Sequence, residues 1–188
     1  RNDMAKLEGL QLVYQPYNSS GRMPTSKWLR AFVNYLMEDI PDHFLNQRND
    51  LHFYSDSKKM SDFAHKITFD LAKNTREISF FFVPEKSIHS FCWIADFLES
   101  NMSNMWEDIF KLIRVIEDKN SFSTFIRSLP LTSIVNVFIG EENIIDFLKD
   151  YTIIVKEIKI EWEIGYVWII WSLKMDYNFN ISAIKWII

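Results

Sequence analysis

The sequence predicts an α/β or α+β protein in which helices pack on a mixed sheet of five to seven strands. Strand-like and helix-like segments alternate along the 188 residues, joined by short connections without a repeat or a low-complexity linker. The segment 78–83 is apolar on both faces, which is typical of a central strand covered on both sides. Residues 151–177 alternate in polarity about Gly165 and predict an antiparallel hairpin. We therefore expect a single globular domain over residues 1–188, with a layer of helices on each side of the sheet.

Composition restricts the class of protein and its partners. The chain has 48% hydrophobic residues with only 4 Gly and 5 Pro, a composition typical of a packed globular protein. Its one cysteine, Cys92, excludes an internal disulfide and favours a reducing compartment, so we expect the cytoplasm. No segment reaches the roughly 18 apolar residues that a membrane span requires, and we expect no membrane association. The net charge of −4 argues against nucleic acid as a partner and favours a basic protein.

The N-terminal quarter predicts one strand, one loop and one helix. Residues 10–14 have the composition of a strand, and the Asn, Ser, Gly and Pro of residues 17–24 indicate a loop. Thr25 or Ser26 caps the helix that follows, whose apolar side chains recur at helical spacing until Pro41 ends it.

The middle of the chain predicts a short strand followed by helices. Residues 51–54 are the strand candidate, and Ser57 caps a helix that runs to Asn74 with apolar side chains at i, i+3, i+4, i+7 and i+11. After the central strand 78–83, periodicity predicts two more helices, over residues 87–99 and 104–118.

The C-terminal half supplies the remaining elements. We expect a helix over residues 121–128 and a strand over residues 134–139 that ends at Gly140. Two glutamates at the start of residues 141–149 suit the positive end of a helix dipole, so this segment is expected to be helical. Residues 178–188 are expected to add a last strand.

The hairpin of residues 151–177 has a predicted turn and register. Gly165 and Tyr166 form a two-residue turn, with the glycine at the position that requires a positive φ. This register pairs Trp162 with Ile169 on the buried face and places opposite charges across from one another on the other face. Trp162 is therefore expected in the core.

One pattern on this hairpin is typical of an enzyme. Glu157 and Lys159 lie two residues apart on one strand and point the same way, so the carboxylate could hold Mg²⁺ while the lysine neutralises a phosphate. The pair resembles the Glu-x-Lys half of the restriction-like nuclease motif, and the resemblance implies a metal-dependent nuclease. The family's aspartate on a preceding paired strand has no clear counterpart, because Asp146 and Asp150 fall on a helix or at its exit. Asp150 is the third candidate catalytic residue of this alternative.

The same face of the hairpin also has the composition of a binding surface. The acidic residues Glu157, Glu161 and Glu163 lie across from the large apolar side chains of Trp168 and Ile170. An aromatic anchor surrounded by carboxylates suits a basic protein. The alternative is that helices cover this face, in which case Trp168 belongs to the core and the glutamates lie at its margin.

These observations favour a non-enzymatic protein-binding module over an enzyme. No paired-cysteine motif, glycine-rich phosphate loop or His-Glu-His spacing occurs, so we predict no metal site and no cofactor. By analogy of size and charge, the function expected is that of an inhibitor or immunity-type protein that neutralises a basic protein partner. The metal-dependent nuclease is the alternative function.

Overall fold

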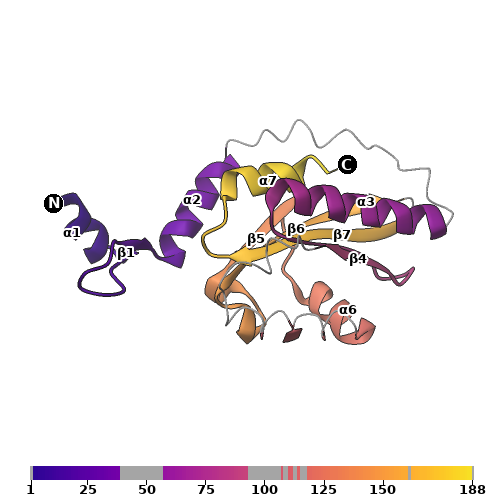
Figure 1. Ribbon diagram of the computed structural model, residues 1–188, viewed down its shortest axis with the longest axis horizontal. Helices are drawn as coiled ribbons and strands as arrows, with labels where there is room; N and C mark the ends of the chain where they lie inside the picture. Colours follow the sequence, from indigo (N-terminus) through magenta and orange to yellow (C-terminus); the bar gives the residue numbers. More distant parts are fainter. Residues whose placement is uncertain are drawn as a thin grey trace.

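A five-stranded antiparallel sheet with the strand order β4-β3-β7-β6-β5 forms the centre of the protein (Figure 1). The computed structural model describes residues 2–38, 57–92, 107, 110, 111, 114, 118–160 and 162–187. Its helices are α1 (Asn2–Gly9), α2 (Ser26–Glu38), α3 (Ser57–Thr75), α6 (Lys119–Ser128) and α7 (Tyr177–Lys185). Its strands are β1 (Val13–Tyr14), β2 (Met23–Pro24), β3 (Ile78–Val83), β4 (Ile88–Cys92), β5 (Val135–Ile139), β6 (Tyr151–Ile160) and β7 (Glu163–Ser172).

The sheet separates two apolar cores. Helices α2, α3 and α7 pack on one face and α6 packs on the other (Figure 1). Because successive side chains of a strand point to opposite faces, Phe80 belongs to the α6 core and Phe81 to the α3–α7 core. Ile153 and Ile154 of β6 divide in the same way. Of the predicted classes, α/β or α+β, the structure is α+β, and the helix layer on each side of a five-stranded sheet is confirmed. The sheet was expected to be mixed, but all of its strand pairs are antiparallel.

The C-terminal hairpin is confirmed, but its predicted turn is wrong. Ile160 pairs with Glu163, so the chain reverses between these two residues, and Gly165 pairs with Ile158 inside β7. The predicted and observed turns differ by four positions, an even number, so both registers place the same residues on the same faces. Polarity alone therefore could not distinguish them. Trp162, expected in the core, lies in the turn itself with 93% of its surface exposed.

Gly165 is required by packing and not by a turn. Gly140 is the glycine with a positive φ among those described, and Gly165 has an ordinary strand conformation. A Cβ atom at Gly165 would lie 2.9 Å from Ile160 Cδ1 and 3.3 Å from Val83 Cγ2. A side chain here would therefore displace buried neighbours in the α3–α7 core.

Gly165→Val is expected to lower the free energy of unfolding by about 1–3 kcal/mol, because the added methyl groups overpack the sheet surface. Gly165→Ala is expected to cost less, since the nearest atom is the end of the flexible Ile160 side chain. Urea unfolding measures both. The matched control is Gly21→Ala, because no atom lies within 4 Å of the Cβ that it adds. If Gly21→Ala and Gly165→Ala lower the free energy of unfolding equally, close packing is not the reason for a glycine at position 165.

Two elements differ in type from their prediction. Within residues 87–99, predicted as a helix, Ile88–Cys92 form the edge strand β4, because pairing with β3 outweighs the helical periodicity. Residues 178–188, predicted as a strand, are largely the helix α7. The Asp176 side chain caps α7 by accepting the Phe179 backbone N–H at 3.0 Å.

Four of the other predicted elements are confirmed, one is wrong, and two lie wholly or mostly outside the described residues. Helices α2, α3 and α6 and strand β5 lie where they were predicted. The segment 141–149 is not one helix, because it contains only the 3₁₀ turns Gly140–Glu142 and Asp146–Leu148. The predicted strand 51–54 and most of the predicted helix 104–118 lie outside the described residues. Of the helices that the structure describes, none is long and apolar enough to cross a membrane.

Candidate functional site

Trp168 and Ile170, the predicted anchors of a binding surface, are buried in the α6 core. Trp168 has no exposed surface and Ile170 has 3%. The Trp168 ring lies 4.5 Å from Phe80, 5.4 Å from Phe122 and 5.9 Å from Phe125, measured between ring centroids. Helix α6 contributes the last two rings, so it covers this part of the hairpin. The alternative in which Trp168 is core therefore describes the structure, and the expected apolar surface patch is absent here.

The predicted acidic rim does not form one site either. Glu157 is exposed on β6, three residues before that strand ends. Glu163 is half-buried and is the first residue of β7, where it pairs with Ile160. Glu161 lies outside the described residues. Without the two apolar anchors, Glu157 and Glu163 are polar residues at the margin of the sheet.

The three candidate nuclease residues are not brought together. Glu157 and Lys159 are both exposed on β6, but their cross-strand partners are Tyr166 and Ile164, neither of which is acidic. Asp150 precedes Glu157 by seven residues of nearly continuous strand, a separation of roughly 23 Å. In the described part of the chain, no group of three His, Cys, Asp or Glu could hold a metal ion. Asp150 is therefore not the nearby carboxylate that the nuclease mechanism needs beside the Glu-x-Lys pair.

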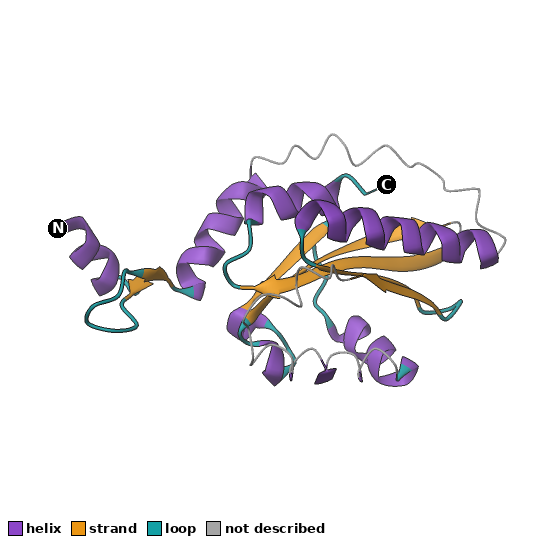
Figure 2. Cartoon of the chain, in the orientation of Figure 1, coloured by secondary structure: helices purple, strands orange, loops and turns teal. Residues whose placement is uncertain are grey.

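A different feature, which the sequence prediction missed, lies at the N-terminal end of the chain. Helix α1 and the two-stranded sheet β1–β2 lie beyond α2, away from the central sheet (Figure 2). We call residues 2–24 the helix–hairpin unit. None of the described side chains of α1 is buried, and Lys6 is among its exposed residues. The unit therefore presents a helix to solvent without a core of its own.

Local hydrogen bonds give the hairpin loop a defined shape. Gln15 Nε2 donates to the carbonyl oxygens of Asn18 and Ser20, both at 2.9 Å. Gln11 adopts a positive φ of 57° where the chain leaves α1 and enters β1. Tyr17, near the tip of the loop, has 76% of its surface exposed. The loop is thus ordered by its own polar groups and still open to a partner.

Side chains also connect the two parts of the unit to each other. Arg22 beside β2 forms an ion pair with Glu8 of α1 at 3.2 Å. Thr25 Oγ1, at the start of α2, donates to the Gln11 carbonyl oxygen at 2.7 Å. The first contact joins α1 to the hairpin, and the second joins the segment after α1 to the start of α2.

Charge is distributed unequally along the chain. Residues 1–30 contain five Lys or Arg and two Asp or Glu, a net charge of +3. Residues 31–188 contain sixteen Lys or Arg and twenty-three Asp or Glu, a net charge of −7. Arg30 pairs with Glu142 and donates to the Val137 carbonyl oxygen, so its charge is directed into the protein. The exposed Lys6, Arg22 and Lys27 remain on the helix–hairpin side.

The shape of the unit suits nucleic acid, while its own charges, Lys6 and Arg22 against Asp3 and Glu8, sum to zero. The major groove admits either a helix or a two-stranded ribbon, and the unit offers both. A local charge count over a window of 30 residues would have shown the excess of positive charge in residues 1–30, which the total charge of −4 conceals.

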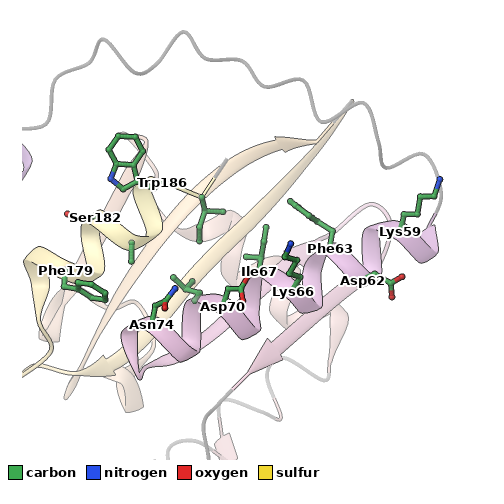
Figure 3. Close-up of a pocket in the computed structure, with 13 residues that line it drawn as sticks. Lys59, Asp62, Phe63, Lys66, Ile67, Asp70, Asn74, Phe179, Ser182 and Trp186 are labelled. Atoms are coloured by element: carbon green, nitrogen blue, oxygen red, sulfur yellow. The ribbon is translucent and has the colours of Figure 1, made fainter.

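A second surface feature is a groove of about 830 Å³ between α3 and α7 (Figure 3). Half-buried apolar side chains line it, including Phe63 and Ile67 of α3 and Ala183 of α7. The exposed Lys66 and Asp70 of α3 lie along its margin. The groove can take up apolar surface, and α7 forms one of its walls.

Helix α7 is attached to the sheet by buried polar groups. Thr152 and Tyr177 form a hydroxyl–hydroxyl hydrogen bond of 2.8 Å at its start. At its other end, Lys156 Nζ donates to the carbonyl oxygens of Lys185, at 2.7 Å, and Ile187. Burial, and after it the positive charge of Lys185, lowers the pKa of Lys156 to about 8. Lys156 therefore caps the helix C-terminus from within the core.

Comparison with known proteins gives a consistent result. A family model described as "HrcA protein C terminal domain" matches residues 28–181. The heat-inducible transcription repressor HrcA of Mycobacteroides abscessus is 37% identical over 79 residues, which are 42% of this chain and 23% of that protein. The repressor of the same description from Mycobacterium sp. strain KMS is 36% identical over 90 residues, 48% of this chain and 26% of that protein. The chain thus spans about a quarter of the length of the curated relatives it matches.

A solved structure described as "Crystal structure of a hypothetical protein at 2.2 A resolution" superimposes with a TM-score of 0.69. It is 18% identical in sequence, and the match covers 97% of this chain and 82% of that chain. At this identity the likeness concerns the fold alone.

The family match and the repressor relatives overturn two predictions from the sequence. The inhibitor or immunity-type function, neutralising a basic protein, is wrong, because the matching proteins are transcription repressors. The exclusion of nucleic acid as a partner is wrong for the same reason. The net charge of this chain does not decide the partners of the matched repressors, because the matches cover only about a quarter of their length.

Proposed function

Because the chain belongs to the family of HrcA C-terminal domains, we propose that it is part of a heat-inducible transcription repressor that binds operator DNA. The observation that carries this proposal is the family match over residues 28–181, a range that includes every strand of the central sheet. A repressor works where the chromosome is, so we propose the cytoplasm as its compartment. We also propose that residues 1–188 act as one structural unit, since Arg30 connects α2 to the end of β5.

Within this function, we propose that the helix–hairpin unit contacts the DNA. The support is its exposed helix, its ordered loop and the exposed Lys6. Phosphate contacts from Lys and Arg supply affinity, and groups that reach base edges supply specificity. The exposed Lys6 suits the first role, and the exposed Tyr17 and Asn18 of the loop suit the second. The acidic remainder, with a net charge of −7, keeps the central sheet away from the phosphates.

Chromatin immunoprecipitation of the full-length protein from its own cells, before and after a heat shock, tests the repressor function. We expect enrichment at a small number of promoters, and we expect the signal to fall while the corresponding transcripts rise after heating. A protein that enriches no promoter at either temperature is not a DNA-binding repressor.

Lys6→Glu is expected to weaken binding of the full-length protein to a recovered promoter fragment at least tenfold, because it replaces a phosphate contact by a repulsive charge. Lys6→Ala is expected to reduce the slope of log affinity against log salt by about 1. Fluorescence anisotropy at several salt concentrations measures both quantities. The matched control is Lys174→Glu, which makes the same charge change at an exposed position between β7 and α7. If the control weakens binding as much as Lys6→Glu, net charge alone is responsible and the helix–hairpin unit is not the contact.

A further inference from the structure

Two buried oxygen atoms without a hydrogen-bond partner belong to the same pair of side chains. Glu77 lies between α3 and β3 and is 6% exposed, and Asn180 of α7 is 1% exposed. Asn180 Nδ2 donates to Glu77 Oε1 at 3.1 Å. The other oxygen of each group, Glu77 Oε2 and Asn180 Oδ1, is buried and accepts no hydrogen bond. With an ionised carboxylate, both atoms remain acceptors and neither can satisfy the other.

A neutral carboxylic acid removes this conflict. A carboxylic acid offers one O–H donor and one carbonyl acceptor, and a primary amide offers an N–H donor and a carbonyl acceptor. The two planar groups can therefore form a ring of two antiparallel hydrogen bonds. One of them is the observed bond from Asn180 to Glu77 Oε1. A proton on Glu77 Oε2 would donate the other to Asn180 Oδ1, and both unsatisfied oxygen atoms would gain a partner.

The surroundings of Glu77 also favour the neutral form. Asp176, the cap of α7, is the charged group that acts on this carboxyl, and its charge is negative. On the α3 side, the neighbouring polar group is the hydroxyl of Thr75, which accepts the Glu77 backbone N–H at 3.2 Å. Burial is the largest influence, and together with Asp176 it outweighs the Asn180 hydrogen bond and raises the pKa of Glu77 to about 8.

We propose that the folded protein holds Glu77 as a neutral carboxylic acid in a cyclic pair with Asn180, and that loss of this proton releases helix α7. The pair joins the α3–β3 connection to the middle of α7. Since α7 is one wall of the α3–α7 groove, the protonation state of Glu77 controls whether that wall is docked. This proposal is independent of DNA binding.

The direction of the pH dependence follows from the two states. The folded form keeps the Glu77 proton up to about pH 8, whereas the unfolded chain loses it near 4.5. Between these values the folded state binds more protons, so its stability falls as pH rises. Lys156 has the opposite effect, because its pKa falls from 10.5 to about 8 on folding. Its contribution makes stability rise with pH between these two values. The two groups can therefore be distinguished in one titration.

Unfolding of the full chain in urea from pH 5 to pH 8 tests the proposal. The folding equilibrium constant of the wild-type protein is expected to fall about 100-fold or more over this range. Glu77→Gln is expected to remove most of this dependence and to be more stable than wild type at pH 8, because an amide pair makes the same two bonds without a proton. The matched control is Glu157→Gln, an exposed carboxylate on β6 whose replacement should leave the pH dependence unchanged. A Glu77→Gln variant that keeps the wild-type pH dependence contradicts the proposal.

Two further measurements test the neutral Glu77–Asn180 pair if the Glu77→Gln variant does not fold. The wild-type protein at neutral pH should show the infrared carbonyl band of a protonated carboxylic acid, and this band should disappear as the pH is raised through the pKa of Glu77. Hydrogen exchange, corrected for its intrinsic pH dependence, should lose protection in α7 before β6 and β7 over the same range. A neutral-pH spectrum without the acid band, or an α7 whose protection follows that of the sheet, overturns the proposal.

Discussion

Trp168→Ala is expected to lower the free energy of unfolding by about 4 kcal/mol, because truncation of a fully buried aromatic side chain loses its transfer energy and leaves a cavity. The cavity cannot close easily, since Phe80, Phe122 and Phe125 surround the ring from two different elements. Urea unfolding followed by circular dichroism measures the change. Trp162→Ala is the matched control on the same hairpin, and because Trp162 is 93% exposed the control should change stability by less than about 0.5 kcal/mol.

The comparison of these two tryptophans also tests the observed register of the hairpin. The register predicted from the sequence would reverse the order, because it places Trp162 in the core. A larger loss for Trp162→Ala than for Trp168→Ala would therefore reject the turn between Ile160 and Glu163.

Phe81→Ala is expected to cost about 4 kcal/mol through the core on the opposite face of the sheet. Phe81 is 1% exposed, and Phe63 of α3 meets its ring edge-on at a centroid distance of 5.9 Å. Phe69→Ala is the control, because Phe69 lies on α3 with 49% of its surface exposed and should cost less than about 1 kcal/mol. Urea unfolding of both variants is the measurement. If Phe81→Ala is as mild as the control, the α3–α7 core does not stabilise the sheet.

Residues with a strong local signal were predicted correctly. The segment Ile78–Val83 has no polar face except Ser79, and it is the strand with a core on each side. Ser26 and Ser57 begin the two helices whose apolar periodicity is clearest. In these places propensity, capping and burial all favour the same structure.

Residues whose structure depends on distant partners were not predicted. Ile88–Cys92 has helical periodicity but pairs with β3, and the apolar segment after Asp176 could be a strand or a helix until its capping side chain is seen. The Trp168 face was ambiguous because only the position of α6 decides whether it is covered. No sequence pattern around Glu77 indicated that its partner would be Asn180, which lies 103 residues away.

The candidate site was missed because charge was summed over the whole chain. Residues 10–14 were predicted as a strand, of which Val13–Tyr14 form β1. The predicted loop 17–24 ends in the strand β2, Met23–Pro24, which is too short to show an alternation. The net charge of +3 over residues 1–30 becomes visible only when the acidic remainder is counted separately.

The order of the strands also determines how the protein can be assembled during its synthesis. Strand β3 lies between β4, which follows it directly, and β7, whose Trp168 pairs with Phe80 from 88 positions further along the chain. At translation rates of about 5–20 residues per second, one edge of this apolar strand stays without its neighbour for roughly 4 to 18 s. An unpaired apolar edge can recruit another nascent chain. The yield of folded protein should therefore depend on the temperature and rate of its synthesis, and not only on the stability of the finished fold.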